Sequence, residues 1–511
     1  MTSHFDLLII GAGGAGCILS RRLAELCPNA RIGLLEAGGE GRRLPFLGSD
    51  LGSVFQAWGP DSNWQLKTIP QSGLANRSVS LTQGKVLGGG TSVNAMMYVH
   101  GDKAVLEEWH RCSGHHPGWD PFRFLNALHA LEACDGEGFD PSIRGVDGPI
   151  RIRSVPHPSA SALAFLEASR DLGYRLGDFN DGRQLDTAGL MQLNLLPDGG
   201  RCSMPVAFLV EGLPDNLELL LSSQVERLVL NGARCSGVTL VDGRELTADH
   251  LVVCTGAFQT PALLMASGIG EPAVLEAASI PCRIANAAVG TNLSDHLRVM
   301  VAYSSDWNPG VTEFLCEAAL FTRSGLSDAA EADIQINFSA GVDGFIPPQF
   351  LPSPAPPHTV IFVPVLARPL SKGSVRPLGP RLRDGFGIDP GYLSHPTDIE
   401  VYSRAVALAR DLAATSSLAP YCRQELCPGE MTVADYLRSH AETIWHPVGS
   451  CAMGSDPASS SCSPDFRLRG TDNVFVADAS VLPSLPSGNP QAAIFAMASL
   501  AAAAIADALR G

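Results

Sequence analysis

The 511-residue sequence predicts an α/β protein, or α+β when the whole chain is considered. Three observations support this class. An apolar strand near the N-terminus enters a glycine-rich turn, strand-like and helix-like segments then follow along the whole chain, and the length exceeds what one hydrophobic core usually organises. We therefore expect two or three domains around a substantial buried interior.

The first element is a strand at residues 5–10, which runs into Gly11, Gly13 and Gly16. Glycines at this GxGxxG spacing allow a tight turn, close approach of the backbone to a pyrophosphate, and packing of the next helix on the strand. The helix that follows, around residues 17–26, would present its N-terminal amides to the anion. The pattern predicts a Rossmann-like unit that binds a dinucleotide.

A second strand at residues 31–35 ends at Glu36, twenty positions after Gly16. A carboxylate at this place can accept hydrogen bonds from both ribose hydroxyls of an adenosine, and it would repel a 2′-phosphate. The alternative is a strand, turn and helix without a ligand. Because turn, helix, strand and acid agree, we favour a dinucleotide, with FAD and NAD both open at this point.

Charge and cysteine content restrict the class of protein. The chain has 52 acidic and 36 basic residues, a net charge of −16 that disfavours nucleic acid and anionic membranes as partners. Thirteen cysteines without a CxxC pair indicate a reducing compartment. The first strand begins too early for a cleavable leader, so we expect a cytoplasmic protein. Cys112, His115 and His116 have no second ligand pair nearby and predict a loop, not a metal site.

Beyond the first unit, the sequence predicts further elements in order. A passage rich in glycine and proline at residues 38–80 precedes a second glycine block at residues 84–94. Residues 119–133 have the spacing of an amphipathic helix. Short strands and turns follow from residue 150, and residues 178–182 predict a loop.

Later segments predict two sheets and a terminal helix. Strands of one sheet are expected at residues 217–229, 236–240 and 251–254, and strands of a second sheet at residues 333–340 and 359–366. The proline-rich loop at residues 346–357 either covers an active site or is only a long connection. The alanine-rich tract at residues 492–509 predicts a buried helix and not a membrane span.

Several separated blocks of the sequence carry a resemblance to a known family. They comprise residues 84–101, 256–270, 290–296, 388–393, 446–449, 476–480 and 488–492. In this order they resemble the signatures of the glucose-methanol-choline oxidoreductases, flavoproteins that oxidise alcohols with FAD. The resemblance covers nearly the whole chain and implies FAD in place of NAD.

The resemblance also implies a domain organisation. The FAD-binding domain would consist of residues 1–155, 206–298 and 441–511, and the substrate domain, with a mixed sheet flanked by helices, of residues 156–205 and 299–440. Val93 stands where family members with covalently attached FAD have a histidine. We therefore expect FAD to be bound without a covalent link.

Oxidation of an alcohol by hydride transfer needs a base at the hydroxyl and flavin N5 on the other side of the carbon. The resemblance places His446 and Asn489 together above the flavin. The neutral imidazole of His446 would take the hydroxyl proton, and the amide of Asn489 would hold the same oxygen. Without the resemblance, a lone histidine beside Trp445 is more often a core residue. Pro490 suits the first position of a helix whose positive end would face the flavin.

The resemblance assigns further residues to each part of FAD. The pyrophosphate would meet Gly11, Gly13 and Gly16; the ribose Glu36 and Ala37; the isoalloxazine Gly88, Gly89, Thr91, Asn94, Ala95, Met96 and Met97; the adenine Val225; the ribityl and phosphate groups Asp478 and Ala479; and the flavin end of the cofactor Pro490 and Gln491. Core packing is an equal alternative for Val225 and Met97.

The substrate wall is expected to be apolar. Trp445, Met97, Val363 and Val365 are candidates, and core packing is the favoured interpretation for the two valines. A tryptophan beside the base suits an aromatic or furanic alcohol. The sequence offers no acidic aromatic cage for a quaternary ammonium such as choline.

These inferences predict an FAD-dependent oxidase or dehydrogenase that converts a small primary alcohol, carried on an aromatic, furanic or other ring, to its aldehyde. Oxygen or another acceptor would reoxidise the flavin. The alternatives are a non-redox lyase with the same fold and flavin, and a flavin-binding protein without turnover. The sequence predicts no oligomeric state.

Overall fold

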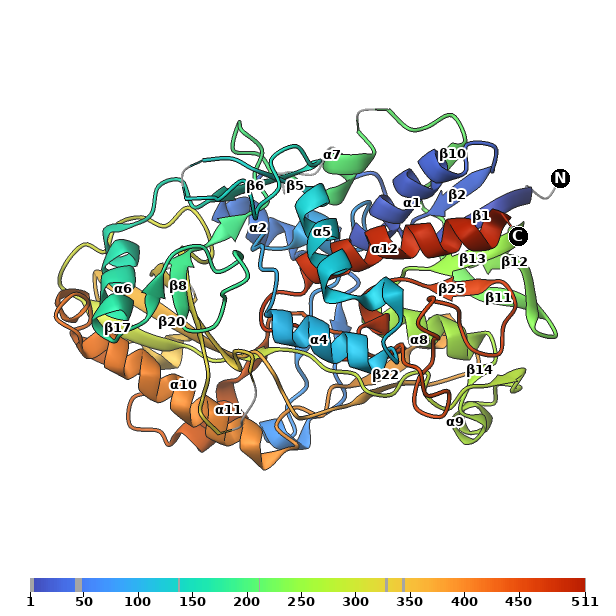
Figure 1. Cartoon of the computed structure of the whole chain (residues 1–511). Helices are drawn as coiled ribbons and strands as arrows, with labels where there is room; N and C mark the ends of the chain where they lie inside the picture. Colours follow the sequence, from blue (N-terminus) through green and yellow to red (C-terminus); the bar gives the residue numbers. More distant parts are fainter. Residues whose placement is uncertain are drawn as a thin grey trace.

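Two large β-sheets, each with helices packed on it, organise the chain (Figure 1). The computed structural model describes residues 4–41, 48–136, 138–210, 212–326, 330–341 and 345–510. Each sheet contributes to its own hydrophobic core. The predicted mixed α/β class is confirmed.

The first sheet is built around parallel strands. Its path is β10-β2-β1-β13-β12-β11, and β25 also pairs with β13. The strands are β1 (His4–Ile10), β2 (Ile32–Leu35), β10 (Leu217–Leu220), β11 (Val225–Asn231), β12 (Arg234–Leu240), β13 (Glu245–Val253) and β25 (Val474–Val476). Only β11 and β12 run antiparallel to their neighbours. Leu7, Leu8 and Ile9 have no exposed surface, as expected for a parallel strand covered on both faces.

The C-terminal helix belongs to the core of this first sheet. Helix α12 (Gln491–Arg510) lies along α1 (Gly14–Leu26) in Figure 1 and also packs on α5 (Pro121–Leu131). By length and composition alone α12 could cross a membrane. Its phenylalanine, Phe495, and a row of its alanines are buried inside the protein. The predicted buried helix at residues 492–509 is therefore confirmed.

Other helices and small sheets surround this core. The helices are α2 (Leu51–Ala57), α3 (Gly90–Val93), α4 (Lys103–Cys112), α7 (Met204–Phe208), α8 (Gly256–Ala266) and α9 (Pro272–Ala277). The small sheets pair β3 (Leu66–Lys67) with β4 (Ser80–Leu81), β14 (Ile269–Gly270) with β15 (Ile284–Ala285), β21 (Ser374–Pro377) with β22 (Phe386–Asp389), and β5 (Glu132–Cys134) with β6 (Ile150–Ser154) and β9 (Gln192–Leu193).

The second large sheet is mainly antiparallel. Its path is β23-β17-β20-β19-β18-β8-β7, and β16 pairs with both β20 and β24. The strands are β7 (Arg175–Leu176), β8 (Thr187–Leu190), β16 (Leu297–Arg298), β17 (Val301–Ser305), β18 (Ala318–Thr322), β19 (Ile334–Ala340), β20 (His358–Leu366), β23 (Gln424–Cys427) and β24 (Glu442–Thr443). Helices α6 (Ala160–Asp171), α10 (Pro396–Ala414) and α11 (Val433–His440) complete this part, where Phe165 of α6 stacks on Phe338 at 4.9 Å between ring centroids. The predicted second sheet is confirmed, and the predicted domain limits at residues 155, 205, 298 and 440 stay a prediction.

Two predicted elements differ from the structure. The strand expected at residues 217–229 is divided into β10 and β11, which lie at opposite edges of the first sheet. Ser222, with φ of 51°, interrupts it, because this backbone conformation cannot continue a strand. The helix expected at residues 119–133 covers only Pro121–Leu131, since Asp120 caps its start and Glu132 begins β5.

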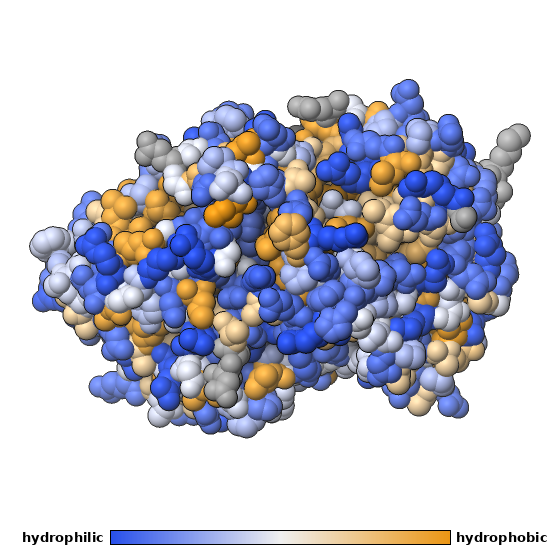
Figure 2. All heavy atoms as spheres, in the orientation of Figure 1, coloured by the Kyte–Doolittle hydropathy of each residue, from blue (hydrophilic) through white to orange (hydrophobic). Residues whose placement is uncertain are grey.

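The surface in Figure 2 carries hydrophobic side chains in separate groups among hydrophilic ones. Exposed examples such as Phe122 and Val311 are scattered along the sequence. Single apolar side chains of this kind are normal on protein surfaces.

A buried charge network holds the segment that leads into the functional site. Arg144 is fully buried and donates to Glu132 at 3.0 Å and to Asp178 at 2.7 Å, and His100 also pairs with Glu132. Burial alone would raise the pKa of Glu132, but the charges of His100 and Arg144 lower it well below its usual value. The amide of His100 also donates a hydrogen bond to the side chain of Asn180. The network therefore holds in place the segment that follows Met97.

We expect the substitution Arg144→Met to destabilise the protein by about 3–5 kcal/mol, because Glu132 and Asp178 would remain buried without their partner. The folded-state pKa of Glu132 lies below its unfolded value, so this loss is full above about pH 5 and shrinks in acid as Glu132 takes a proton. Urea unfolding of both proteins across this pH range measures it. Arg183→Met, which removes an exposed partner of Asp181, is the control and should leave the midpoint unchanged. Equal effects of the two substitutions would contradict the prediction.

Candidate active site

A cavity of about 330 Å³ extends from the first sheet to the second. Its lining includes Glu36 at the end of β2, the start of α12, and Asn337 and Val363 on the second sheet. In sheets with parallel strands, ligands bind beyond the carboxyl ends of the strands, which is where β1 and β2 meet this cavity. Both sheets therefore contribute to one site.

The glycine turn after β1 shapes the first end of the cavity. Gly11 has φ of 102°, and a Cβ atom there would lie 2.5 Å from the carbonyl oxygen of Cys254. Gly11 and Gly13 line the cavity. Gly16 does not line the cavity, and its predicted place at the pyrophosphate stays a prediction. A Cβ atom on Gly16 would lie 1.9 Å from the oxygen of Gly11, so this glycine lets α1 pack on the turn.

Glu36 is buried at the same end, and Ala37 beside it also lines the cavity. The Glu36 carboxylate accepts hydrogen bonds from the amides of Ala12 at 3.1 Å and Gly38 at 2.8 Å. Burial raises its pKa to about 7, although these amide hydrogen bonds oppose the rise. One carboxylate therefore connects the end of β2 to the glycine turn.

The second glycine block packs directly against the first. The amide of Gly88 donates to the oxygen of Ala12 at 2.7 Å, and a Cβ atom on Gly89 would lie 2.9 Å from Cα of Gly13. The residues of this block that line the cavity are Gly89, Thr91, Asn94, Ala95, Met96 and Met97, and their contact with the isoalloxazine stays a prediction. Gly88 lies outside the lining, because it is enclosed by Ser92 and Pro205.

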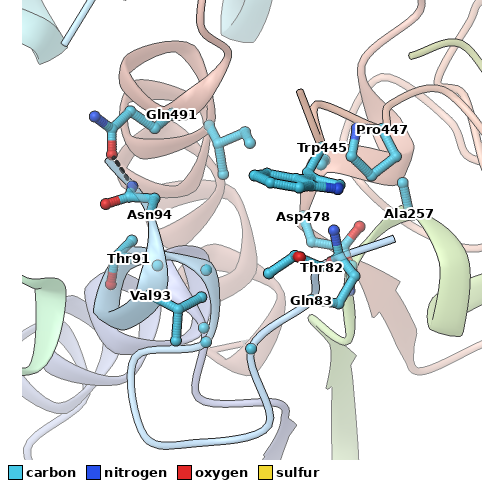
Figure 3. A pocket seen from close by; sticks show the side chains of 18 of the residues that line it. Thr82, Gln83, Thr91, Val93, Asn94, Ala257, Trp445, Pro447, Asp478 and Gln491 are labelled. Atoms are coloured by element: carbon cyan, nitrogen blue, oxygen red, sulfur yellow. Dashed lines mark hydrogen bonds between the residues drawn. The ribbon is translucent and has the colours of Figure 1, made fainter. Parts of the chain in front are cut away.

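The start of α12 is bound to this block by side chains. Asn94 donates to Gln491 at 2.9 Å (Figure 3), and Gln491 donates to Asn194 at 2.8 Å and to the oxygen of Met97. Pro490 and Gln491 both line the cavity. Residues that lie almost four hundred positions apart therefore form one wall.

A buried arginine that the sequence analysis missed supports this wall from behind. Arg201 donates to the oxygen of Asn94 at 2.5 Å and to its side chain at 2.9 Å. Burial lowers the pKa of Arg201 to about 10, and within the described chain its Nε and Nη2 atoms have no hydrogen-bond partner. The wall thus has a positive charge behind it, and no acid among the described residues forms an ion pair with that charge.

Asp478, Ala479 and Val225 also line the cavity. The Asp478 carboxylate accepts hydrogen bonds from the amide of Gly256 at 2.8 Å and the hydroxyl of Thr260 at 2.6 Å. It therefore connects the segment after β25 to the start of α8.

The two predicted catalytic side chains, 43 positions apart in sequence, meet in the cavity. Nδ2 of Asn489 lies 3.2 Å from Nε2 of His446. The amide of His446 donates to Asp295 at 2.7 Å, and Asp295 also accepts from Thr443 at 2.5 Å. Asp295 therefore holds the backbone on which the imidazole is mounted.

His296 fixes the tautomer of His446. The Nε2 atom of His296 lies 2.9 Å from the oxygen of Ala367, which can only accept, so this nitrogen carries a proton. Burial lowers the pKa of His296 to about 4, and its Nδ1 is therefore an acceptor. The Nδ1 atoms of His296 and His446 are 3.0 Å apart, so His446 donates from Nδ1. The Nε2 atom of His446 is left as an acceptor facing Asn489.

The environment keeps His446 neutral. Burial lowers its pKa well below the usual value, and the neighbouring His296 lowers it further. The sequence places His296 only within the block at residues 290–296 and assigns it no role of its own. An uncharged imidazole with an unprotonated Nε2 atom can accept a proton there.

The second-sheet end of the cavity is aromatic and apolar. Trp445 and Met97 line it, and so does Val363, for which core packing was the favoured interpretation. Trp58 contacts Trp445 edge to face at 4.7 Å between centroids. Val365 does not line it, because it is fully buried where β20 pairs with β16 and β19. Three lining residues that the sequence analysis missed are Trp58, Phe345 and Arg298.

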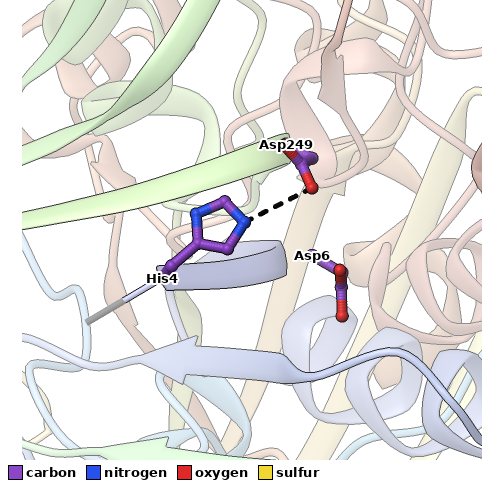
Figure 4. Close-up of side chains that lie close together, drawn as sticks. All are labelled: His4, Asp6 and Asp249. Carbon is purple, nitrogen blue, oxygen red and sulfur yellow. Dashed lines mark ion pairs between the residues drawn. The ribbon is translucent and has the colours of Figure 1, made fainter.

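The described residues offer one group of three potential metal ligands, His4, Asp6 and Asp249 (Figure 4). These side chains are partly or fully exposed, and His4 pairs with Asp249 at 3.4 Å. Asp6 accepts the amide of Arg31 at 2.6 Å. The group lies at the beginning of β1, whereas the cavity begins after its end, about 20 Å away at the rise of a β-strand.

Comparison with known proteins identifies the family of this chain. The GMC oxidoreductase family matches it over residues 5–298 and again over residues 369–498. An alcohol dehydrogenase [acceptor] of Pseudomonas putida is 31% identical and covers 98% of this chain and 95% of its own length. A pyridoxine 4-oxidase of Microbacterium luteolum is 32% identical over 97% of this chain and 98% of its own, and human mitochondrial choline dehydrogenase is 31% identical over 98% and 89%.

Solved structures agree. Pyridoxine 4-oxidase from Mesorbium loti has a TM-score of 0.88 and 31% identity, with 98% of both chains covered. A formate oxidase, 23% identical with a TM-score of 0.87 over 99% of this chain and 98% of its own, shares the fold. The chain belongs to the GMC oxidoreductases and is an FAD-dependent enzyme that acts on CH–OH donors.

Proposed function

We propose that this enzyme oxidises a small primary alcohol, carried on an aromatic, furanic or other ring, to its aldehyde, with His446 as the general base. The observation that carries the proposal is the neutral His446 imidazole, whose unprotonated Nε2 atom lies beside the Asn489 amide in the cavity. The aromatic end next to it, with Trp445 and Trp58, supports a ring-bearing substrate.

The residues of the cavity fit FAD along its length. Glycines at positions 11, 13 and 89 leave room for a close approach of the cofactor, and Glu36 is placed to accept ribose hydroxyls. The Asn94 and Gln491 wall would hold the isoalloxazine, which when bound accepts hydride at N5. Val93, buried and without a nucleophilic atom, supports non-covalent binding.

His446 would remove the hydroxyl proton of the alcohol through Nε2. The alkoxide character that develops on the oxygen favours departure of hydride from the carbon. The proton stays on the His446 imidazole, whose Nδ1–H bond to His296 keeps the ring oriented during the transfer.

Asn489 would stabilise the charge that develops on the same oxygen. Its Nδ2 group is the donor, because its Oδ1 atom faces Gln335 at 3.4 Å. Gln335 is itself held by Asn337 at 2.7 Å, which fixes the amide before substrate arrives. The start of α12 at Pro490 adds the positive end of a helix dipole beside it.

Relatives include both an oxidase and a dehydrogenase that uses another acceptor. Measuring peroxide against aldehyde during turnover separates the two. A non-redox lyase would give product without bleaching the flavin under anaerobic conditions.

We also propose a cytoplasmic location, which the thirteen unpaired cysteines support.

The substitution His446→Gln tests the proposal. We expect the rate of flavin reduction by benzyl alcohol, measured by anaerobic stopped flow, to fall by about 10²- to 10⁴-fold, because the base is lost. FAD content should be unchanged. His358→Gln, at the start of β20, is the control. Reduction of the His446→Gln flavin at the parent rate would show that another group is the base.

His296→Leu should lower the same rate, since nothing would then hold His446 in the Nδ1–H tautomer. The base acts only when neutral, so activity is lost as pH falls through its pKa. Removing His296 removes one cause that lowers this pKa, and the acid limb should move to higher pH. His296→Gln, whose amide oxygen can accept the same hydrogen bond, should restore part of the rate. A pH profile that does not move would contradict this role.

Glu36→Gln should raise the dissociation constant of FAD by about ten- to a hundredfold, because one carboxylate oxygen that accepts hydrogen bonds becomes a donor. Rebinding of FAD to the apoprotein, followed by fluorescence, measures it. Glu25→Gln on the exposed face of α1 is the control. Unchanged affinity in Glu36→Gln would remove this residue from the cofactor site.

A further inference from the structure

The substrate end of the cavity contains a positive charge. Among the described residues that line the cavity, Arg298 is the one lysine or arginine. The lining carboxylates, Glu36 and Asp478, lie at the end of β2 and beside α8. The chain as a whole carries a net charge of −16, so this cation is not part of a generally basic surface.

Arg298 is the second residue of β16, and it follows His296, which lies just before that strand, by two positions. Arg298 pairs with Val365 on β20 and with Glu442 on β24. Val363, next along the same face of β20, lines the cavity beside Asn337.

The guanidinium has capacity left to bind a ligand. Its Nη2 donates to Glu442 at 2.7 Å, and its centre lies 5.2 Å from the ring of Phe345. No other hydrogen bond within the described chain engages it. The side chain of Arg298 is 14% exposed, whereas that of Glu442 is 53% exposed. Solvent therefore screens the charge of Glu442 more than the charge of Arg298. An arginine keeps its charge in such surroundings and offers a planar, paired donor.

The aromatic residues near Arg298 do not form an empty cage for a cationic substrate. The cation over Phe345 is supplied by the protein itself. A trimethylammonium group brought to this end would meet a like charge, which is unfavourable in a partly desolvated cavity. A carboxylate would instead gain a charge-assisted hydrogen bond.

We infer that the enzyme acts on ring alcohols that carry an anionic group, typified by a carboxylate, on the side of the ring opposite the hydroxymethyl group, and that Arg298 selects them. His446 and Arg298 both line the cavity, so one substrate can reach both. This inference rests on the proposed function, because His446 must bind the hydroxyl for Arg298 to meet the far substituent.

Three alcohols test it: benzyl alcohol, 4-(hydroxymethyl)benzoate, and the 4-trimethylammonium derivative of benzyl alcohol. We expect kcat/KM to be highest for the carboxylate and lowest for the cation. In Arg298→Met the ratio of carboxylate to neutral alcohol should fall by about ten- to a hundredfold, and Arg298→Lys should keep part of it. Glu442→Gln, which frees the guanidinium, should raise the ratio several-fold. Ratios within one variant cancel differences in the amount of active enzyme.

Arg410→Met is the matched control, because Arg410 pairs with Glu425 on the same sheet but does not line the cavity. It should leave the ratio unchanged. A second readout needs no turnover: 4-methylbenzoate should perturb the flavin spectrum at lower concentration than 4-methylbenzamide, and Arg298→Met should abolish the difference.

The outcomes separate the two proposals. If benzyl alcohol fails to bleach the flavin and 4-methylbenzoate still binds through Arg298, the proposed function fails and the anion site stands. If benzyl alcohol is oxidised but the carboxylate is no better and Arg298→Met leaves both ratios unchanged, the anion site is overturned. Equal binding of 4-methylbenzoate and 4-methylbenzamide would also overturn it.

Discussion

The hydrogen bond between the Nδ1 atoms of His296 and His446 is the contact on which the site depends. His296 can accept this hydrogen bond through Nδ1 only because the carbonyl of Ala367 holds the His296 proton on Nε2. The tautomer of His446 is thus set, through His296, by the carbonyl of Ala367, the residue that follows β20 of the second sheet. Asp295 ties the two histidine segments together through their amides. A base so constrained needs no reorganisation to accept a proton, which is the property that preorganised sites use for catalysis.

Both sheets must be in place before this geometry exists. His296 precedes β16 of the second sheet, whereas Asn489 precedes α12 of the first core. The glycine turns reinforce the junction, since Gly88 donates to Ala12 and Gly89 packs on Gly13. The wall of Asn94 and Gln491 adds side-chain hydrogen bonds between the same regions. Close backbone contacts and side-chain hydrogen bonds therefore connect the first glycine turn, the second glycine block and the start of α12. Larger side chains in place of the glycines, or apolar ones in place of the amides, would separate these segments.

The sequence was informative where one local rule dominates. The GxGxxG turn, the apolar strand before it and the alanine-rich helix were predicted because each depends on near neighbours in sequence. The division of residues 217–229 was missed because an apolar run does not reveal a left-handed residue such as Ser222. Gly16 and Gly88 were assigned to the cofactor, yet their lack of a side chain serves packing. The sequence did not reveal roles for His296, Arg201 and Arg298. Each of these roles depends on partners that are distant in sequence, and residue spacing does not show such partners.

Charge placement distinguishes the two ends of the cavity. At the nucleotide end an acid, Glu36, is buried among amide donors, which suits hydroxyl groups. At the substrate end the cation of Arg298 lies over the ring of Phe345 and pairs with the half-exposed carboxylate of Glu442. Relatives with similar identity act, by their names, on choline and on pyridoxine, so the fold itself does not set the charge of the substrate. We infer that Arg298, two positions after His296, sets which substrate charge is preferred. A substitution there would alter this preference and leave His446 and Asn489 in place. In these proposals His446 and Asn489 carry catalysis and Arg298 carries selection, so separate side chains of one cavity divide the two tasks.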